Sequence, residues 1–338
     1  MRLVDIDNFT ESDVNKILEK GIADCHCDTI NFMTDGNNNY SYKFSQLNPS
    51  THVDLPRLKQ GNVKLQFFAV CPTDFPNDNL KQALIMIESF HRNVEYNFRD
   101  IGLVYSMEDL KKLKQQNKIA ALLAIEGGEV LEGSIEVLGI LYRLGVRSLS
   151  LTWNYQNQLA DGALAEDFKR GLTAKGKKVI KAMEALGIIV DLAHLSTKSF
   201  EEAVEVISKP PLISHANSYK LCPHPRNLSD EKLKIIAEKK GLIGVSFYPP
   251  FITTNEVTKN NGFEKLLDHF VHIASLIGVE YIALGSDFDG IDQTIDGLKD
   301  ATSYGCLIKG LLTRGFSRRE VELITSENVY RLLYENLN

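Results

Sequence analysis

The segment GIADCHCDT (Gly21–Thr29) ends a short apolar run with a histidine and a carboxylate, His26 and Asp28. Side chains of a strand alternate between its two faces, so these two residues share one face and Cys25 and Cys27 share the other. An imidazole beside a carboxylate at the end of a buried strand is half of a metal site. Short matches of this kind also arise by accident in loops, so the other polar residues of the chain decide between the two interpretations.

Further residues with metal-binding or acidic side chains also end apolar runs. They are Glu126, His194, His215 and Asp287. One histidine at a strand end is most often a structural residue. Together with His26 and Asp28, however, these residues converge if their strands are parallel and close into a barrel, because active sites lie at the carboxyl ends of barrel strands. The sequence therefore predicts one shared metal site.

The inventory of ligands favours two metal ions over one. Three histidines and several carboxylates exceed what one tetrahedral ion requires. Glu126 is the natural bridge between two ions, because each of its carboxylate oxygens can bind one of them. Gly127 and Gly128 follow it and are expected to let the backbone approach the ions closely. Paired ions share a hydroxide at neutral pH and polarise the group that it attacks.

Eight short apolar runs, each followed by a longer amphipathic stretch, carry these residues. Continuous apolar strands alternating with helices are typical of a parallel sheet covered on both faces, so we predict an α/β fold, a (β/α)8 TIM barrel. A doubly wound open sheet is the alternative, but no G-x-G-x-x-G follows the first strand. We expect a single domain over residues 1–338, with a short N-terminal lead-in and C-terminal helices. The expected strands lie within Gly21–Thr29, Val63–Val70, Ile119–Gly128, Val146–Trp153, Ile188–His194, Pro211–Ala216, Leu242–Tyr248 and Tyr281–Gly290.

Composition excludes several classes of partner. The formal net charge of the 338-residue chain is −6, from 38 basic and 44 acidic residues, which argues against nucleic acid or an anionic membrane. Five cysteines, an odd and scattered set, indicate a reducing compartment, and we interpret Cys25 and Cys27 as buried core residues. The N-terminus lacks the pattern of a secretory signal, and no apolar run approaches the roughly 18 residues of a membrane span. We therefore expect a cytoplasmic protein.

Six sequence blocks resemble those of the membrane dipeptidase (renal dipeptidase) family of zinc metallopeptidases, within the amidohydrolase superfamily. The blocks are ADCHCDT, LLAIEGGE, VDLAHLS, LISHANSY, HPRNLSD and GSDFDG, in the family's order and spacing. The resemblance implies a barrel of the metal-dependent hydrolase type that hydrolyses L,L and L,D dipeptides, and a homodimer. It also implies two zinc ions, although other divalent ions are an alternative. The implied ligands are His26 and Asp28 for one ion, His194 and His215 for the other, and Glu126 as the bridge.

The resemblance assigns roles to two more residues. Arg226, within HPRNLSD, is expected to bind the carboxylate at the C-terminal end of the substrate, for which its planar guanidinium is well suited. Asp287 is expected to lie beside the bridging water and the substrate amine, to accept a proton from the water and to pass it to the leaving amine. Asp287 and Glu126 are thus the expected catalytic residues.

One segment departs from the family pattern. Mammalian members end the fourth strand with a histidine that helps to hold the substrate, whereas this chain has Trp153 there, followed by Asn154. Tryptophan offers a single N–H donor, and Asn154 is an alternative donor. We expect Trp153 to contact the substrate, together with Tyr248 at the end of the seventh strand. The departure keeps a second function open, a deacylase of N-acyl-D-amino acids or another amidohydrolase, and a third, a barrel that binds peptide or metal without turnover.

Overall fold

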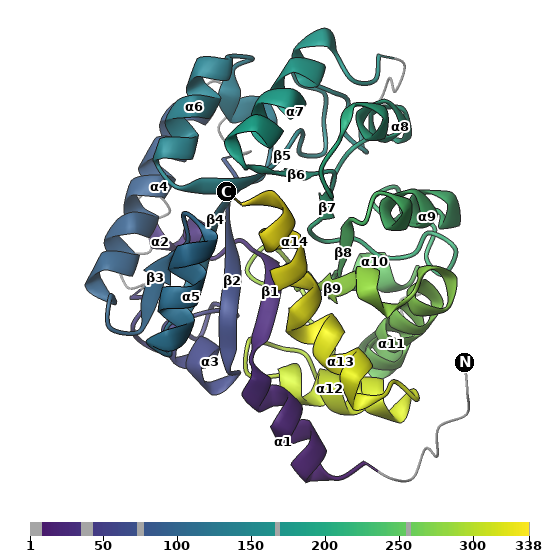
Figure 1. Cartoon of the computed structure of the whole chain (residues 1–338). Helices are drawn as coiled ribbons and strands as arrows, with labels where there is room; N and C mark the ends of the chain where they lie inside the picture. The colour runs from purple at the N-terminus through teal and green to yellow at the C-terminus, as the bar shows by residue number, and fades with distance from the viewer. Residues whose placement is uncertain (1–8, 35–42, 73–77, 166–169, 255–257, 338) are drawn as a thin grey trace. The chain divides into compact units, whose positions relative to one another are not determined.

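The structure is a computed structural model that describes residues 9–34, 43–72, 78–165, 170–254 and 258–337 (Figure 1). Contacts divide the chain into two compact units, each built from separate stretches of sequence. Unit 1 consists of residues 1–29, 43–66 and 214–331, and unit 2 consists of residues 30–42, 67–213 and 332–338. The single domain expected from the sequence stays a prediction.

Unit 1 contains a parallel ladder of buried strands. In it, β1 pairs with β9, with Asp24 opposite Leu284, and β9 pairs with β8, with Ile243 opposite Ile282. Every residue of these strands is buried, as expected for strands covered on both faces. The parallel register brings the carboxyl ends of β1 and β9 together. The strands are β1 (Ile22–Cys27), β8 (Leu242–Val245) and β9 (Ile282–Leu284), and β2 (Val63–Val70) begins in this unit.

The helices of unit 1 begin where the sequence supplies caps. Ser229 accepts a hydrogen bond from the backbone of Lys232 at the start of α9, and Ser317 forms a capping box with Glu320 at α13. Helix α1 packs on α12, and α9 packs on α11. The helices are α1 (Glu11–Lys20), α3 (Leu55–Gln60), α9 (Asp230–Glu238), α10 (Pro249–Ile252), α11 (Thr258–Ile277), α12 (Tyr304–Thr313) and α13 (Arg318–Glu322), with helical turns η3 (Val279–Tyr281) and η4 (Leu323–Glu327). The last helix, α14 (Asn328–Asn336), begins in this unit.

Unit 2 contains the other strands in simple chain order, β3-β4-β5-β6-β7. All the pairings between these neighbours are parallel, with Ile101 opposite Ile119 and Ser148 opposite Ile189, for example. An order without reversal excludes the doubly wound alternative, which requires a switch point. The strands are β3 (Ile101–Leu103), β4 (Ile119–Ile125), β5 (Val146–Ser150), β6 (Ile189–Asp191) and β7 (Leu212–Ile213).

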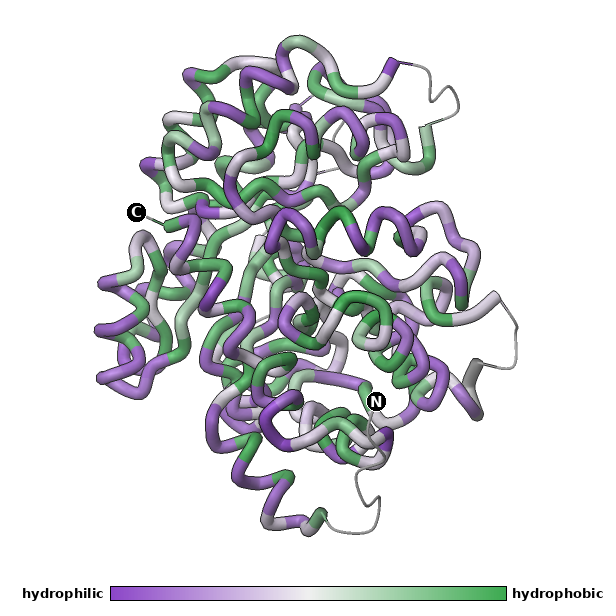
Figure 2. Tube along the Cα trace, turned by 45° about the vertical axis from the view of Figure 1, so that its right-hand side comes forward, coloured by the Kyte–Doolittle hydropathy of each residue, from purple (hydrophilic) through white to green (hydrophobic). Residues whose placement is uncertain are grey.

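The helices of unit 2 also follow local sequence signals. Thr173 caps the start of α7, and Gly187 ends it in the left-handed region at φ 83°. Ser106 and Ser196 cap α5 and α8 in the same way. The helices are α2 (Ile30–Met33), α4 (Asn79–Tyr96), α5 (Met107–Gln115), α6 (Ile135–Arg143), α7 (Ala174–Leu186) and α8 (Thr197–Val206), with the helical turn η2 (Gly128–Leu131). Along the tube in Figure 2 the helices change between hydrophobic and hydrophilic colours, as amphipathic helices do.

The fold is the predicted α/β class, a (β/α)8 barrel. Each of the eight expected strands contains an observed strand, while β3 is an additional strand of three residues that no pattern announced. Among the described residues, no helix is both long enough and apolar enough to span a membrane.

Candidate metal and substrate site

Unit 1 brings three predicted site residues into one buried cluster. His26 Nε2 lies 3.1 Å from Asp28 Oδ2 and 3.8 Å from Asp287 Oδ1. The possible ligand atoms of the three residues all lie within 4.8 Å of one another. His26 and Asp28 are each 3% exposed and Asp287 is 8% exposed. Two carboxylates held this close, away from water, repel each other unless a positive charge compensates them.

The backbone at the ends of β1 and β9 creates this cluster. Asp287 donates its N–H to the carbonyl of His26, at 3.2 Å, and Asp28 donates to the carbonyl of Phe288, at 2.9 Å. Asp287 has a φ of 65°, a left-handed conformation that is uncommon outside glycine. Gly290 completes the turn, because a Cβ there would lie 2.1 Å from Asp28 Oδ2 and 2.9 Å from Asp287 Oδ1. The two carboxylates therefore occupy space that only glycine leaves open.

Asp24 holds the strand ends beside the cluster in place through hydrogen bonds, a role that the sequence did not reveal. Its carboxylate accepts hydrogen bonds from the Ser286 N–H, at 2.9 Å, and from the Tyr304 hydroxyl, at 2.7 Å. Ser286 immediately precedes Asp287, so this network fixes the end of β9 against the end of β1. Asp24 belongs to the ADCHCDT block, but its partners Ser286 and Tyr304 lie 262 and 280 residues away in sequence, so the block alone does not reveal them.

His215 and Arg226 form a second contact within unit 1. Arg226 Nη2 lies 2.6 Å from His215 Nε2, and Ser214 Oγ lies 2.9 Å from His215 Nδ1. A guanidinium can only donate, so Nε2 accepts and Nδ1–H donates to Ser214. The rings of His215 and His26 lie 4.0 Å apart between centroids. His215 therefore lies beside His26 in the cluster of unit 1, with Nε2 toward Arg226 and Nδ1 toward Ser214.

Tyr248 lies in unit 1 at the start of α10, with its ring 4.9 Å from that of Phe251. Burial raises the pKa of its hydroxyl, and the charges of Asp292 and Asp287 add to that shift. Tyr248 thus lies within electrostatic reach of Asp287, and it stays a protonated donor at neutral pH.

Unit 2 pairs the remaining predicted ligands. His194 Nε2 lies 2.6 Å from Glu126 Oε1, and both residues are 6% exposed. His194 Nδ1 lies 2.9 Å from Asn154 Oδ1, so an N–H at Nδ1 donates to this amide and Nε2 faces Glu126. His194 has a φ of 68°, and its carbonyl accepts from Ala163 at 2.7 Å. Asn154 therefore orients the imidazole, a role different from the substrate donor expected from the sequence.

The two glycines after Glu126 make room for protein atoms. A Cβ on Gly127 would lie 2.4 Å from Glu129 Oε2, and one on Gly128 would lie 2.6 Å from the carbonyl oxygen of Leu151. Gly127 also has a φ of 105° and donates its N–H to Ser150 Oγ at 2.9 Å. These glycines thus let the turn after β4 pack against the end of β5.

The donor set fits a divalent cation. Imidazole nitrogen and carboxylate oxygen are the ligands that zinc takes in sites without thiolate. In each unit a polar side chain contacts Nδ1 of one histidine and orients its ring. Ser214 does this for His215, and Asn154 does it for His194. Metal-binding histidines are usually oriented in this way.

Comparison with known proteins identifies the family. The family model described as membrane dipeptidase (peptidase family M19) matches residues 12–337. The chain belongs to the membrane dipeptidase family. It is a metallopeptidase of the dipeptidase type, as the sequence blocks predicted, and its family depends on a divalent metal.

Curated relatives of the membrane dipeptidase family cover most of the chain. Dipeptidase tcpJ of Claviceps purpurea is 34% identical over 295 residues, which are 84% of this chain and 69% of that protein. An uncharacterized dipeptidase of Schizosaccharomyces pombe is 32% identical over 327 residues, 92% of this chain and 80% of that protein.

Solved structures of membrane dipeptidase relatives share the fold. The crystal structure of dipeptidase AC, an M19 metallopeptidase, has a TM-score of 0.87 at 24% identity, covering 94% of this chain and 98% of that one. A metallopeptidase from Rhodobacter sphaeroides, solved with a phosphinate mimic of the dipeptide L-Ala-D-Ala, has a TM-score of 0.85 at 22% identity, covering 94% and 99%.

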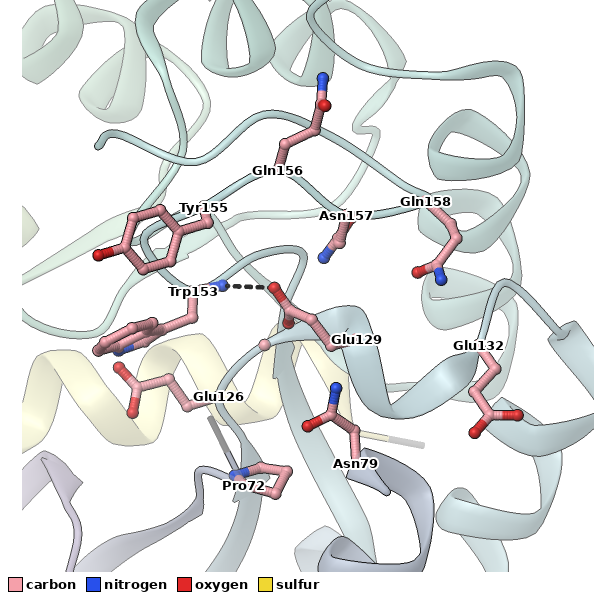
Figure 3. A pocket seen from close by; sticks show the side chains of 11 residues that line it. Pro72, Asn79, Glu126, Glu129, Glu132, Trp153, Tyr155, Gln156, Asn157 and Gln158 are labelled. Carbon is pink, nitrogen blue, oxygen red and sulfur yellow. Dashed lines mark hydrogen bonds between the residues drawn. The ribbon is translucent and has the colours of Figure 1, made fainter. Parts of the chain in front are cut away.

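A cavity of about 640 Å³ adjoins Glu126 within unit 2 (Figure 3). Trp153 lies at one wall, with its ring 5.7 Å from that of Tyr155 and 6.3 Å from that of His194. The backbone N–H of Trp153 donates to Glu129 Oε1 at 3.4 Å. Glu129 is therefore a second residue that the sequence did not single out, although the EGGE block contains it.

Each unit thus gathers a subset of the predicted site residues of the membrane dipeptidase. Unit 1 holds His26, Asp28, His215, Arg226, Tyr248 and Asp287, and unit 2 holds Glu126, Trp153 and His194. The residues missed were the polar partners behind the ligands. The sequence contained little that pointed to them. Ser214 precedes the predicted ligand His215, and Asp24 belongs to the ADCHCDT block.

Proposed function

We propose that this chain hydrolyses the peptide bond of dipeptides at a centre of two zinc ions. The observation that carries the proposal is the pair of buried ligand sets, one in each unit, within a chain of the membrane dipeptidase family. The residues that would hold the ions are His26, Asp28, Glu126, His194 and His215. That both sets serve one centre, with Glu126 as the bridge, rests on the family resemblance and on their positions at strand ends.

When bound, the ions supply Lewis acidity toward the scissile carbonyl and lower the pKa of a water. The protein holds the ligands in the required tautomers. Asn154 and Ser214 accept the Nδ1 protons of His194 and His215, which leaves the Nε2 lone pairs for coordination.

Arg226 is the anchor for the C-terminal carboxylate of the substrate. Its side chain is 5% exposed, lies over the Phe251 ring at 5.2 Å and ends at His215 Nε2. The Nε2 lone pair can serve one partner only, so a metal ion held by His215 would leave the guanidinium free to bind a carboxylate. The planar fork then binds both carboxylate oxygens.

Asp287 acts as the proton acceptor for the attacking water and returns that proton to the leaving amine. Its fixed left-handed backbone and the Gly290 turn aim the carboxylate at His26. Tyr248, a donor within electrostatic reach of Asp287, contacts the substrate, and Trp153 does so beside His194.

Both L,L and L,D dipeptides are proposed as substrates. The relative from Rhodobacter sphaeroides was solved with a mimic of L-Ala-D-Ala, which supports an L,D substrate here. The homodimer and the cytoplasmic location remain predictions from the sequence.

Trp153 favours one alternative, a deacylase of N-acyl-D-amino acids. Its ring and that of Tyr155 give the cavity beside Glu126 an aromatic wall, which an acyl chain can contact as well as a peptide can. Kinetics with matched dipeptides and N-acyl-D-amino acids separate the two activities.

The test is the metal content of protein purified without added metal, together with the release of amino acids from a panel of L,L and L,D dipeptides. About two zinc ions per chain and activity lost on chelation are expected. Two ions with turnover of N-acyl-D-amino acids alone would favour the deacylase. A chain that neither contains nor takes up metal would overturn the proposal.

A further inference from the structure

The cavity beside Glu126 carries a net negative charge that the metal chemistry does not use. Besides Glu126, two more glutamates line it, Glu129 and Glu132, and none of the described lining residues is basic. Glu132 is exposed, whereas Glu129 is partly buried. Coordination of metal compensates Glu126 but leaves the other two carboxylates without a cation from the cavity wall.

Glu129 is held in an environment that disfavours its charge. Its Oε1 accepts from the backbone of Trp153, while its buried Oε2 has no hydrogen-bond partner in the described part of the chain. Burial raises the pKa of Glu129, hydrogen bonding by its own backbone, by Asn157 and by the backbone of Trp153 lowers it in part, and the charge of Glu126 adds a small further rise. A cation in the cavity would therefore stabilise the ionised form of Glu129. The attraction between a cation and a partly buried carboxylate is stronger than that between two exposed charges.

The remaining walls suit a long side chain that ends in hydrogen-bond donors. Trp153 and Tyr155 present aromatic rings at an interplanar angle of 65°, and the faces of such rings attract cations. The side chains of Asn79, Asn157 and Gln158 add polar groups around the same space (Figure 3). The stem of lysine or arginine can pack on the rings while its charged end reaches the glutamates.

We propose that this cavity is the subsite for the side chain of the substrate's N-terminal residue, and that it selects lysine or arginine. The proposal rests on the proposed dipeptidase function, because that function assigns the C-terminal carboxylate to Arg226 and proton transfer to Asp287, both in unit 1. The cavity instead adjoins Glu126, a ligand of the ions that polarise the scissile carbonyl. That carbonyl belongs to the N-terminal residue, so its side chain is the group nearest to this cavity.

The first experiment compares kcat/KM of the zinc-loaded enzyme for Lys-Ala, norleucyl-Ala, Ala-Lys and Ala-Ala. Norleucine has the length of lysine without its amine, so the ratio of the first two substrates isolates the charge. A preference of about tenfold for Lys-Ala is expected from one charge-assisted interaction. A ratio near one would overturn the inference, and a preference confined to Ala-Lys would overturn the assignment to the N-terminal residue.

Variants locate the source of the preference. Glu129→Gln is expected to reduce the ratio of Lys-Ala to norleucyl-Ala by about fivefold to tenfold, and Glu132→Gln by about twofold because its carboxylate is exposed. Glu205→Gln, an exposed glutamate of α8 in the same unit, is the matched control and should leave all four rates unchanged. Equal ratios in all three variants would contradict the inference. If Glu129→Gln does not fold, Glu132→Gln and the wild-type panel still decide.

Binding separates this inference from the proposed function. Calorimetry on metal-free protein should show tighter binding of lysine amide than of norleucine amide, and the difference should shrink in Glu129→Gln. A preserved difference without hydrolysis of any dipeptide would refute the dipeptidase function alone. Hydrolysis of Ala-Ala without a difference in binding or rate would refute the subsite alone.

Discussion

The two units place the predicted site residues in contrasting surroundings. In unit 1, His26, Asp28 and Asp287 are enclosed, and the network of Asp24, Ser286 and Tyr304 fixes the strands behind them. In unit 2, the Glu126–His194 pair adjoins a cavity of about 640 Å³. On the proposed function, the enclosed cluster of unit 1 would serve metal binding and proton transfer, whereas the cavity of unit 2 would provide space in which substrates are distinguished.

Both units nevertheless use the same backbone device. Asp287 in unit 1 and His194 in unit 2 have φ values of 65° and 68°, and each lies three residues beyond the end of its strand, β9 or β6. Non-glycine residues in this region store about 1–3 kcal/mol of strain, which the surrounding contacts must offset. In each unit, the left-handed backbone of this one residue sets the direction of its own side chain, Asp287 in unit 1 and His194 in unit 2.

The largest expected effect concerns Asp287. Replacing it by Asn removes the proton acceptor and should lower kcat by about 10²- to 10⁴-fold, with little change in zinc content. Steady-state kinetics and metal analysis measure both quantities. Asp292→Asn, at an exposed acid nearby, is the control. An unchanged kcat in Asp287→Asn would assign proton transfer to another group.

The orienting residues allow a direct comparison between the units. Ser214→Ala removes the acceptor for His215 in unit 1, and Asn154→Ala removes the acceptor for His194 in unit 2. Each should weaken zinc binding by about 10- to 100-fold, as losses behind a metal ligand commonly do. Competition with a chelator of known affinity measures the change. If zinc affinity fell in only one of the two variants, only the histidine of that unit would be a metal ligand.

Acid should destabilise unit 1 through His269. Its Nδ1 accepts from Ser218 N–H at 3.1 Å, its Nε2 contacts the carbonyl of Ile252 at 3.0 Å, and burial lowers its pKa from 6.5 to about 4. The unfolded chain therefore binds this proton more readily, so the stability contribution is complete above pH 6.5 and is lost as the pH falls toward 4.

Urea unfolding at pH 7 and pH 5 tests this expectation. His269→Gln should reduce the pH dependence of the free energy of unfolding by about 2 kcal/mol over that interval. His272→Gln is the comparison, at a histidine whose ring pairs with Asp230 near the surface. Identical pH dependence in wild type and His269→Gln would refute the assignment. The contribution of Glu129 in unit 2 to stability depends on pH in the opposite direction. Because its pKa is raised in the folded protein, ionisation of Glu129 lowers the stability as the pH rises.

The smallest effect tests the network behind the ligands. Tyr304→Phe removes one of the donors to Asp24 and should lower the free energy of unfolding by about 1 kcal/mol. Ser150→Ala, which leaves the N–H of Gly127 without its partner, is the equivalent change in unit 2. A loss in zinc affinity as large as that of Ser214→Ala would show that Asp24 also orients the ligands.

The sequence predicted the fold class and family because the signals for both are local. Strands such as Val63–Val70 appear as apolar runs, and residues such as Ser106 and Gly187 mark helix ends. Strand β3 escaped notice because three residues, Ile101–Leu103, display no period. At the site, strand-end position indicated the ligands, but their orienting partners depend on contacts between distant residues, such as Asp24 with Tyr304.

The interleaving of the units along the sequence has a consequence for protein synthesis. Ser286 and Asp287 follow His26 by 260 or more residues, whereas the central stretch of unit 2, residues 67–213, is continuous. At about 5–20 residues per second, the ribosome needs roughly 10 to 50 s to reach Asp287 after His26 has emerged. The continuous stretch 67–213 of unit 2 can therefore fold first, whereas the cluster of His26, Asp28 and Asp287 in unit 1 is completed only after Asp287 has been synthesised.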